Sequence, residues 1–543
     1  MKKYLFIALA ALGFAACAEK DDHNLSVNNG EKEQSYMAVT FTADGVTRAD
    51  EYVVGTNEER AVKSAHVFFF QNGEAFTVAD RSSHPGDVNW VNVMDQMNGQ
   101  PNDEDGDAMP NVSDIKDKVI VLKNYKGEYP THVVAVLNWT PVNPTYSLDE
   151  LKAVISELGN DTNGYVMSNS VYLNKNAETV DAVALTEANI AKNESDAKAN
   201  PIIIHVERVA AKVEFPEATN GGLYDINRTV EDTVDNQPNG EANETKVYAK
   251  IVGFELFNDY EKSWLIKKVD ESWGLIDTQV GFMWNEPGRY RSFWANSLSP
   301  LNGENFPANT FAWGTDNTAV GGYNYIGENT REWSEADDVR TKVIVKAQLV
   351  KQDGVTPVEV VSWWGKEYVG EDHLKIVVAN TLNTTYYKYD GSKYVGIEPE
   401  DLACVARNSD DENAYEVYFN IAQDKKGQNW HKYVENRYDE IELDKLNEEL
   451  KEVQPAHVYK NGMTYYYTNI EHLGATDSKA EFGVVRNHVY RVNITDIEGY
   501  GTPVYNENLI FETPDKPVDI DTYVSAQINI LSWRVVDHNY ELN

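Results

Sequence analysis

The last stretch of the chain, residues 521–543, constrains the fold more than any other sequence feature. Apolar and polar residues alternate along its first half, which is the pattern of a strand that buries one face. The apolar positions then shift by one residue, so we predict a bulge or sheet crossing near Ile530–Leu531. The apolar positions are Val524, Ala526, Ile528 and Ile530, followed by Leu531, Trp533 and Val535. This strand either ends the chain's own sandwich or leaves to complete a neighbour's sheet.

Composition and charge indicate a β-rich protein that does not bind nucleic acid. The chain has 543 residues, of which 42% are hydrophobic, enough for the packed cores of two or three domains. Its 32 Tyr and 12 Trp favour strands over helices. The formal net charge is −39 and is spread along the chain, so phosphate backbones would be repelled.

The N-terminus is typical of an exported protein. Residues 1–16 are predicted to be a signal peptide, with two lysines and an apolar run too short to cross a membrane. The sequence FAAC ending at Cys17 resembles a bacterial lipobox, which implies cleavage before Cys17 and acylation of its thiol, although Phe14 stands where Leu is usual. The following Lys20-Asp21-Asp22 resembles the tag of surface-exported Bacteroidetes lipoproteins. The alternative is an ordinary signal peptide with a chance cysteine. The other cysteine, Cys404, is predicted to be a buried structural thiol.

A short strand and an exposed loop follow the polar residues 18–34. In the strand, Met37, Val39 and Phe41 alternate with small or polar residues. The next residues, DGVTRAD at 44–50, are rich in turn formers and contain Arg48. An exposed loop with one arginine is where a trypsin-like protease would cut, although Arg60 would also serve.

The body of the chain is predicted to alternate short strands with long polar connections, as in antiparallel sandwiches. Helices are expected at 147–159, where Ser147 and Glu150 make a capping box, and at 186–199 and 444–453. Strands at 118–122 and 132–137 are expected to form a pair. Further strands are expected at 65–70, 75–79, 202–215, 247–257, 342–350, 358–364, 415–421, 463–468 and 487–497.

No motif indicates catalysis, and we predict neither enzyme activity nor a cofactor. The chain lacks a nucleophile elbow, a zinc-protease helix motif and a phosphate loop. Asp103, Asp105 and Asp107 are spaced as in a calcium loop, but the required Gly and Glu are missing, so we predict no metal. Tryptophans could form a sugar platform, but such residues are more often core or loop anchors. They are Trp284, Trp294, Trp313, Trp333, Trp363 and Trp364.

Six stretches of the chain share their order with a known family. They are SYMAVT (35–40), TRA (47–49), VERVAAKV (206–213), KNGMTYYYTNI (460–470), VVRNHVYRVNITDIEGYG (484–501) and DTYVSAQINILSWRVV (521–536). In them the chain resembles the Bacteroidetes fimbrillins, or type V pilins, and specifically the Mfa-type major shaft subunits described in Porphyromonas. The resemblance does not extend over the middle of the chain, about 216–450.

The resemblance implies how the protein matures and assembles. Cys17 would carry the lipid, and an Arg-specific protease would cut between Arg48 and Ala49. This cut removes the lipid together with the strand that contains Met37, Val39 and Phe41. The loss opens an apolar groove, which the C-terminal strand of the next subunit, residues 523–536, would fill by strand addition.

These expectations define the fold class and the domains. The predicted fold is all-β, with two antiparallel β-sandwich domains of the transthyretin-like kind and a few short helices. The segments are the signal peptide 1–16, the lipidated propeptide 17–48, an N-terminal domain 49–200, a C-terminal domain 201–498, and a linker with donor strand, 499–543. The linker is shorter than in some family members and contains Leu509-Ile510-Phe511, an apolar run able to pack on the parent domain and limit the donor's reach.

The sequence therefore predicts a pilin, the major subunit of surface fimbriae that support adhesion and biofilm formation. Its precursor would be an outer-membrane lipoprotein, acylated with palmitate and exported through the periplasm. The expected partners are identical subunits, anchor and tip fimbrial proteins, and the maturing protease, with the surface receptor left open. The alternatives are an anchor or tip subunit of the same fold, or a carbohydrate-binding surface lipoprotein.

Overall fold

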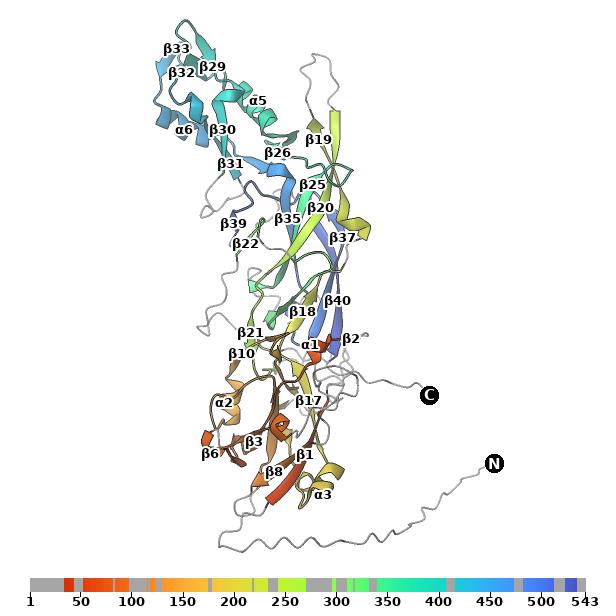
Figure 1. Ribbon diagram of the computed structural model, residues 1–543. Coiled ribbons are helices and arrows are strands. Elements are labelled where there is room, and N and C mark those ends of the chain that lie inside the picture. Colours follow the sequence, from red (N-terminus) through yellow and green to blue (C-terminus); the bar gives the residue numbers. More distant parts are fainter. Residues whose placement is uncertain are drawn as a thin grey trace, which may run out of the picture.

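The fold is all-β, as predicted, and the molecule is elongated (Figure 1). The computed structural model describes residues 34–42, 52–81, 84–96, 115, 118–123, 129–173, 178–216, 219–232, 243–269, 295–298, 310–315, 318–331, 339–406, 416–472, 482–511 and 523–534. The described α-helices are short: α1 (Asn57–Arg60), α2 (Leu148–Lys152), α3 (Glu194–Ala199), α5 (Glu371–Leu382) and α6 (Leu443–Lys451).

The N-terminal sheet lies at the lower end of the molecule in Figure 1, and its strands β3 (Ala65–Gln71) and β9 (His132–Leu137) are buried on both faces. Its main path runs β4 (Glu74–Ala75), β3 (Ala65–Gln71), β9 (His132–Leu137), β13 (Met167–Asn169), β17 (Ile202–Arg208), β1 (Gln34–Thr42) and β8 (Lys118–Lys123), and β7 (Trp90–Asn92) and β16 (Val183–Ala184) pair off this path. Along β3, Phe68 and Phe70 enter one apolar cluster while Val67 and Phe69 enter another. Burial on both faces explains why this strand is a continuous apolar run instead of an alternating one.

The C-terminal part is a sandwich of two sheets around one core. The smaller sheet contains β2 (Tyr52–Val54), β40 (Tyr523–Arg534), β37 (His488–Glu498), β18 (Ala211–Glu214) and β23 (Tyr323–Ile326). The larger contains β19 (Leu223–Asp232), β20 (Asn243–Phe257), β25 (Lys342–Val350), β35 (Met463–Asn469) and β38 (Thr502–Pro503), and continues into a lobe. Val213 and Tyr490 from the smaller sheet share a cluster with Val247 and Val345 from the larger one. This shared core confirms the predicted sandwich packing.

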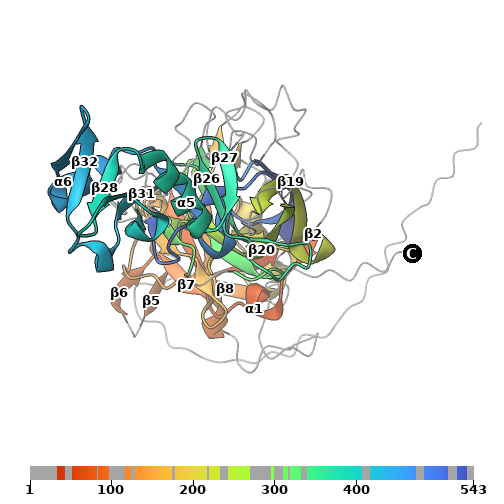
Figure 2. The same cartoon turned by 90° about the horizontal axis from the view of Figure 1, so that it is seen from above.

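The lobe, residues 351–462, is inserted between β25 and β35, which are paired neighbours in the larger sheet. It adds β26 (Val360–Trp363), β27 (Lys366–Val369), β30 (Leu402–Ala406), β31 (Glu416–Ile421) and β34 (Ala456–Tyr459) to that sheet. A separate sheet in the order β29 (Tyr394–Gly396), β28 (Tyr386–Tyr389), β32 (Trp430–Val434) and β33 (Arg437–Glu440) lies further out. The lobe has its own apolar core, to which α5 and α6 contribute, and Figures 1 and 2 show its outer part, with β32 and α6, projecting from the body.

The remaining strands form small pairs. They are β5 (Ala79–Arg81) with β6 (His84–Val88), β10 (Ile155–Glu157) with β21 (Lys262–Trp264), β11 (Gly159–Asn160) with β12 (Gly164–Tyr165), β14 (Tyr172–Leu173) with β15 (Thr179–Val180), β22 (Phe311–Ala312) with β39 (Ile510–Phe511), and β24 (Asn329–Arg331) with β36 (Phe482–Val484).

The predicted strand 202–215 is wrong as a single element, because the chain changes sheets within it. β17 pairs in the N-terminal sheet, and β18 pairs with β23 and β37 in the C-terminal sheet. At the break, the Val209 amide donates to the Val166 carbonyl (3.0 Å), and the Ala210 carbonyl accepts from the Asn487 amide (2.7 Å). An unbroken apolar run gives no local sign of such a crossing, because the partners come from distant segments.

Three other expectations are corrected by tertiary pairing. The strands at 118–122 and 132–137 do not pair with each other, since β8 pairs with β1 and β9 with β3 and β13. The capping box at Ser147 is present, but α2 ends at Lys152 because residues 155–157 pair with β21. The expected helix 186–199 is reduced to a short 3₁₀ turn and α3, and the expected strand 75–79 to β4 and the start of β5.

Two fully buried ion pairs lie together beside β17, where the chain passes from the N-terminal to the C-terminal sheet. Arg486 contacts Glu328 at 2.9 Å, and Lys267 contacts Glu207 at 2.8 Å. The Arg486 guanidinium also donates to the carbonyls of Leu265 and Trp264. Burial raises the pKa of Glu207, which the positive charges of Lys267 and Arg486 oppose. Buried charges are tolerated only with such partners, so each pair depends on both of its members.

Replacing Arg486 with alanine should lower the free energy of unfolding by about 3–5 kcal/mol, because the buried Glu328 carboxylate loses its partner. Urea unfolding followed by circular dichroism measures the change. The matched control is Arg491→Ala, which removes a partly exposed pair with Glu214 (3.0 Å) and should cost about 1 kcal/mol or less. Equal losses of unfolding free energy in the two variants would show that burial does not decide how much an ion pair contributes to stability.

Candidate assembly site

The strand predicted to be removable, β1, lies inside the N-terminal sheet. It is hydrogen-bonded on both sides, parallel to β17 with Val39 opposite Ile202, and antiparallel to β8 with Met37 opposite Ile120. Helix α3 packs beside β1 and β8 at the lower end of the molecule (Figure 1). Loss of β1 would therefore leave two strands with unpaired edges facing each other across a slot one strand wide.

The side chains of β1 are part of the core. Met37, Ala38 and Val39 have no exposed surface. Met37 and Val39 belong to an apolar cluster with Phe69, Ile120 and other residues of β8, β9 and β17. Burying these two side chains stabilises the domain by roughly 3–6 kcal/mol. Of Phe41, the structure describes the backbone, which pairs opposite Ile204.

The predicted cleavage bond, Arg48–Ala49, lies outside the described residues, in the segment 43–51 between β1 and β2. This segment connects the two sheets, because β1 is in the N-terminal sheet while β2 pairs in parallel with β40 in the C-terminal one. Cys17 and the possible calcium loop, Asp103, Asp105 and Asp107, also lie outside the described part of the chain.

The chain just after β2 is fixed at the junction between the two parts. Thr56 caps α1 with a capping box. The buried carboxylate of Glu59 contacts the ammonium of Lys212 at 3.0 Å and accepts a hydrogen bond from the Tyr325 hydroxyl. Burial alone would raise the pKa of Glu59, but the Tyr325 hydrogen bond and the Lys212 charge outweigh it and keep the pKa below its usual value. The alternative cleavage residue, Arg60, is buried in α1.

The predicted donor strand lies in its own subunit's C-terminal sheet. β40 is antiparallel to β37, with Ile530 opposite Tyr490, and parallel to β2, with Ser532 opposite Tyr52. Its backbone is described from Tyr523 to Arg534, so Val535 lies outside the described residues. β1 and β40 thus share one arrangement, with one parallel and one antiparallel neighbour each.

The predicted irregularity near Ile530–Leu531 is wrong for the pairing of β40 with β37. The register is continuous there, and the shift lies instead between Ile494 and Asp496, opposite Ala526 and Ser525. The extra residue therefore belongs to β37, which the alternation of the terminal stretch could not reveal.

The linker before β40 packs on the parent domain over its first half. The side chains of Val504 and Phe511 are buried, and Phe511 stacks on Phe311 with ring centroids 5.0 Å apart and meets Tyr465 edge-on. β39 pairs with β22 at the same place. Residues 512–522 remain between this docked segment and β40, and a chain of that length spans at most about 40 Å.

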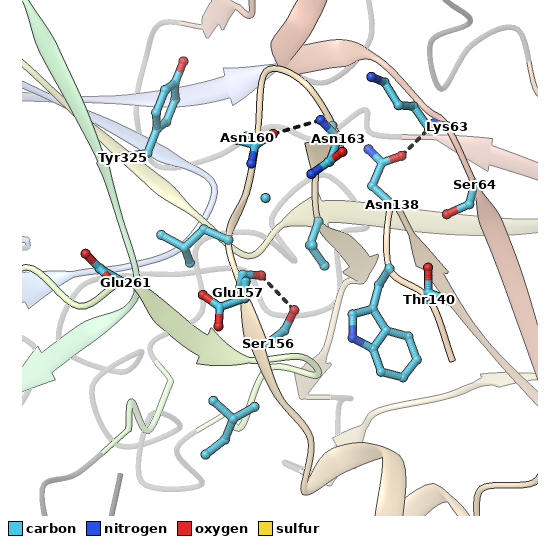
Figure 3. Close-up of a pocket in the computed structure, with 16 residues that line it drawn as sticks. Lys63, Ser64, Asn138, Thr140, Ser156, Glu157, Asn160, Asn163, Glu261 and Tyr325 are labelled. Carbon is cyan, nitrogen blue, oxygen red and sulfur yellow. Dashed lines mark hydrogen bonds between the residues drawn. The ribbon is translucent and has the colours of Figure 1, made fainter. Parts of the chain in front are cut away.

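A polar pocket of about 890 Å³ opens near the junction, and several of its side chains already form hydrogen bonds with backbone groups of other lining residues (Figure 3). The Asn138 amide oxygen accepts from the backbone of Lys63, and that of Asn160 accepts from the backbone of Asn163. Ser156 donates to the carbonyl of Glu157. Because these groups are satisfied internally, the pocket gives no sign of a required ligand.

Three of the tryptophans considered for a sugar platform are described, and two of them, Trp363 and Trp364, stack with ring centroids 5.0 Å apart. Trp313 donates its indole N–H to the Thr464 carbonyl (3.0 Å), and Trp363, nearly buried, donates to the Gln454 carbonyl (2.8 Å). Both are therefore anchors, whereas Trp364 is exposed. Trp284, Trp294 and Trp333 lie outside the described residues.

Cys404, predicted to be buried, is half-buried, and burial raises the pKa of its thiol to about 12. In the described part of the chain, no helix has the length and apolar character needed to span a bilayer. The same residues contain no group of three or more potential metal ligands.

Two stretches that carried the family resemblance meet at the junction, which the sequence alone did not show. The Arg208 amide of VERVAAKV donates to the Asn487 side chain of VVRNHVY (3.2 Å), and Lys212 pairs opposite Val489. The contact could have been inferred from charged residues inside apolar runs, such as Glu207, Arg208 and Arg486. Charged residues are seldom buried without partners, so these residues indicate a buried contact between distant segments.

Comparison with known families identifies the C-terminal segment. Residues 457–539, which include β35, β37 and β40, match the family model described as "Major fimbrial subunit protein type IV, Fimbrillin, C-terminal". The resemblance to fimbrillins is thereby confirmed over this segment. No curated protein matches the chain in sequence.

Similar solved structures include a fimbrilin (FimA) from Porphyromonas gingivalis W83, with 13% identity and a TM-score of 0.37, covering 92% of this chain and 99% of that one. Another is the tip fimbrial protein Mfa3 from Porphyromonas gingivalis with C-terminal truncation, with 12% identity and a TM-score of 0.28, covering 92% of this chain and 100% of that one. These values are too low to carry an argument, so the family assignment rests on residues 457–539.

Replacing Val39 with aspartate should displace β1 from its sheet, because an unpaired carboxylate would be buried among apolar side chains. Amide hydrogen exchange in β1 should accelerate by at least roughly tenfold. The matched control is Ile203→Asp on the neighbouring β17, where the side chain is 54% exposed and the exchange of β1 should change little. Unchanged exchange in the Val39 variant would show that β1 is not held by its core side chains.

Replacing Phe511 with alanine should release the linker from the parent domain, since it removes the ring that stacks on Phe311. Phe-to-Ala changes in cores cost about 3–5 kcal/mol, more than a two-residue strand can offset. Limited proteolysis should then cut within 504–511, which stays protected in the native chain. Ile510→Ala, at the adjacent exposed position, should leave the cleavage pattern unchanged.

Proposed function

From the fimbrillin C-terminal region that this chain carries, we propose that the protein is a major shaft subunit of surface fimbriae that polymerises by donor-strand exchange. The matched family is described as a major fimbrial subunit, which points to a structural protein of a cell-surface fimbrium that assembles with other subunits. The single observation that carries the assembly mechanism is the position of β1, an interior strand joined to the rest of the chain through the segment that contains Arg48.

The acceptor site is the slot that β1 occupies. A cut after Arg48 separates β1 from the chain that continues at Ala49, and non-covalent contacts then hold β1 in place. Its departure exposes the edges of β17 and β8 together with the core residues that Met37 and Val39 covered. An open slot of this kind favours any strand that restores both ladders and the apolar contacts.

The donor is β40, which already has the neighbour arrangement that the slot demands. In the slot it would run parallel to β17 and antiparallel to β8, just as it now runs parallel to β2 and antiparallel to β37. The exchange replaces the ladder hydrogen bonds of β40 with β37 and β2 by those with β17 and β8, worth about 1 kcal/mol each. Refilling the apolar slot is favourable, and the net gain is what remains after the contacts that β40 leaves in its own subunit are subtracted. Val524, Ala526, Ile528, Ile530, Leu531, Trp533 and Val535 are the candidate side chains for it.

The docked linker sets the reach of the donor. Residues 512–522 allow at most about 40 Å beyond Phe511, to which the length of β40 itself is added. A subunit therefore engages a neighbour held close to its own C-terminal sandwich. This short tether raises the effective concentration of the donor at the neighbour's slot.

Export and maturation complete the proposal. The precursor is an outer-membrane lipoprotein acylated at Cys17, exported through the periplasm, and cut between Arg48 and Ala49 by an Arg-specific protease. The burial of Arg60 in α1 supports Arg48 as the residue that is cut. Anchor and tip fimbrial proteins are the further partners, and the assembled fimbriae support adhesion and biofilm formation.

An anchor or tip subunit of the same fold is the alternative. An anchor keeps its lipid and its β1, and a tip subunit would usually lack a donor tail. The presence of a twelve-residue terminal strand favours the shaft role.

Arg48→Ala and deletion of residues 523–543 should each abolish the high-mass ladder of heat-labile polymers on gels of sheared surface protein. The first variant should retain an acylated N-terminus at Cys17, whereas the second should begin at Ala49 and stay monomeric. Intact mass and N-terminal sequencing distinguish the two. Arg60→Gln is the control and should polymerise normally. Polymers formed by the deletion variant would refute β40 as the donor.

A further inference from the structure

The outer sheet of the inserted lobe has an unusual distribution of side chains between its two faces. On the inner face, Tyr386 and Trp430 join the lobe's core. Lys388 on this face contacts Asp401 at 2.7 Å, and Lys432 contacts Glu449 at 2.8 Å. The positive charges of these strands are therefore turned inward and neutralised by carboxylates.

The other face is aromatic. Residues directly opposite each other in an antiparallel ladder share a face, and the register pairs Tyr389 with Tyr394, Tyr387 with His431, Tyr433 with Tyr438, and His431 with Glu440. We call the five tyrosines and His431 the tyrosine face. Of these outward positions, Glu440 carries the only formal charge at pH 7.

The rings of the tyrosine face form one continuous cluster. Tyr394 stacks on Tyr438 with centroids 3.8 Å apart, and Tyr438 meets Tyr387 and Tyr433 at 4.9 Å each. Tyr389, Tyr394, Tyr433 and Tyr438 nevertheless each expose 37–40% of their surface. A set of large aromatic residues left accessible on one sheet face is typical of an interaction surface.

The tyrosine face lies apart from β1 and β40, the strands proposed to take part in assembly. The lobe is inserted between two paired strands, β25 and β35, that a short turn could connect, so the body does not need it to close its sheet. It stands at the end of the molecule away from β1, and β40 belongs to another sheet (Figures 1 and 2). An insertion of this kind adds a function to a scaffold instead of building it.

The charges on and around the tyrosine face indicate which class of partner can bind there. The π faces of tyrosines attract guanidinium and ammonium groups, and Glu440 adds a carboxylate beside them. The exposed Arg437 is already paired with Asp439 at 2.9 Å. The net charge of −39 adds long-range attraction for basic partners and repels acidic ones. Anionic glycans and nucleic acids are therefore unfavourable ligands.

The shape of the sheet favours a polypeptide. Within the described residues, β33, which contains Tyr438 and Glu440, is an edge strand of this sheet, so its outer backbone groups face away from β32. An extended segment can pair along such an edge while its basic side chains reach the aromatic rings. We propose that the tyrosine face binds an extended polypeptide segment rich in arginine and lysine.

Fluorescence anisotropy with a labelled ten-residue peptide of alternating Arg and Gly tests the proposal on the full mature chain at 0.15 M salt, where diffuse charge attraction is screened. The double variant Tyr394→Ala/Tyr438→Ala keeps the net charge and should weaken binding by roughly tenfold or more. The double Phe variant should bind within about twofold of the native chain, because the rings remain. Glu440→Gln should weaken binding a few-fold.

Tyr129→Ala is the matched control, since Tyr129 has the same 38% exposure as Tyr438 but lies in the N-terminal domain. It should not change binding. Equal affinity of the native chain and the double Ala variant would overturn the proposal and assign peptide binding to overall charge. The proposal would also be overturned if the native chain bound neutral oligosaccharides but not the peptide, and if the double Ala variant lost that oligosaccharide binding. Deletion of 523–543 should leave peptide binding intact, so failure here is distinct from failure of the assembly mechanism.

Discussion

The crossing of the chain from β17 to β18 is the constraint on which the rest of the structure depends. Within a few residues the backbone leaves the N-terminal sheet, meets Asn487 and enters the C-terminal sheet. Charged side chains surround this point in the interior, and Arg486 with Glu328 and Lys267 with Glu207 neutralise one another there. Apolar contacts alone would allow many relative positions of two domains, whereas such pairs are favourable in only one geometry. The junction therefore holds the slot of β1 and the strand β40 in a fixed relation.

In the proposed strand exchange, one strand takes the place of another that is bound in the same way. A strand bound on both sides contributes ladder hydrogen bonds and core side chains at once, so no smaller group can replace it. β1 and β40 have equivalent surroundings in different sheets, one parallel and one antiparallel neighbour each. The segment that contains Arg48 leads from β1 to β2, the strand beside β40. The proposed cut in this segment would separate β1 from β2 and leave β1 held only by its ladder and core contacts.

The inserted lobe contains none of the strands of the proposed exchange. The lobe contributes Val358, Val360 and Tyr459 to the core of the C-terminal sandwich, whereas its outer sheet packs through Tyr386 and Trp430 on the lobe's own core. The outward face of that sheet is therefore not needed for packing. Lysines directed inward to carboxylates and tyrosines directed outward give that sheet one structural face and one face open to binding. The strands of the proposed exchange and the proposed binding face thus belong to different sheets.

The β-rich class, most strand positions and the terminal strand follow from the order of the amino acids, because period-two alternation and β-branched or aromatic runs are local properties. Helix α6, the capping box of α2 and the apolar run Leu509–Phe511 could be predicted for the same reason, because each is specified by neighbouring residues. Phe511 of this run packs on the parent domain. Only the tertiary structure decided which strands pair. It broke the run 202–215 between two sheets, shortened the helix at Ser147 and placed the register shift in β37 instead of β40. It also gathered tyrosines from four strands onto one face. Each of these depends on partners far away in sequence, whose choice is set by the burial and hydrogen bonding of the whole chain and leaves no mark in any single segment.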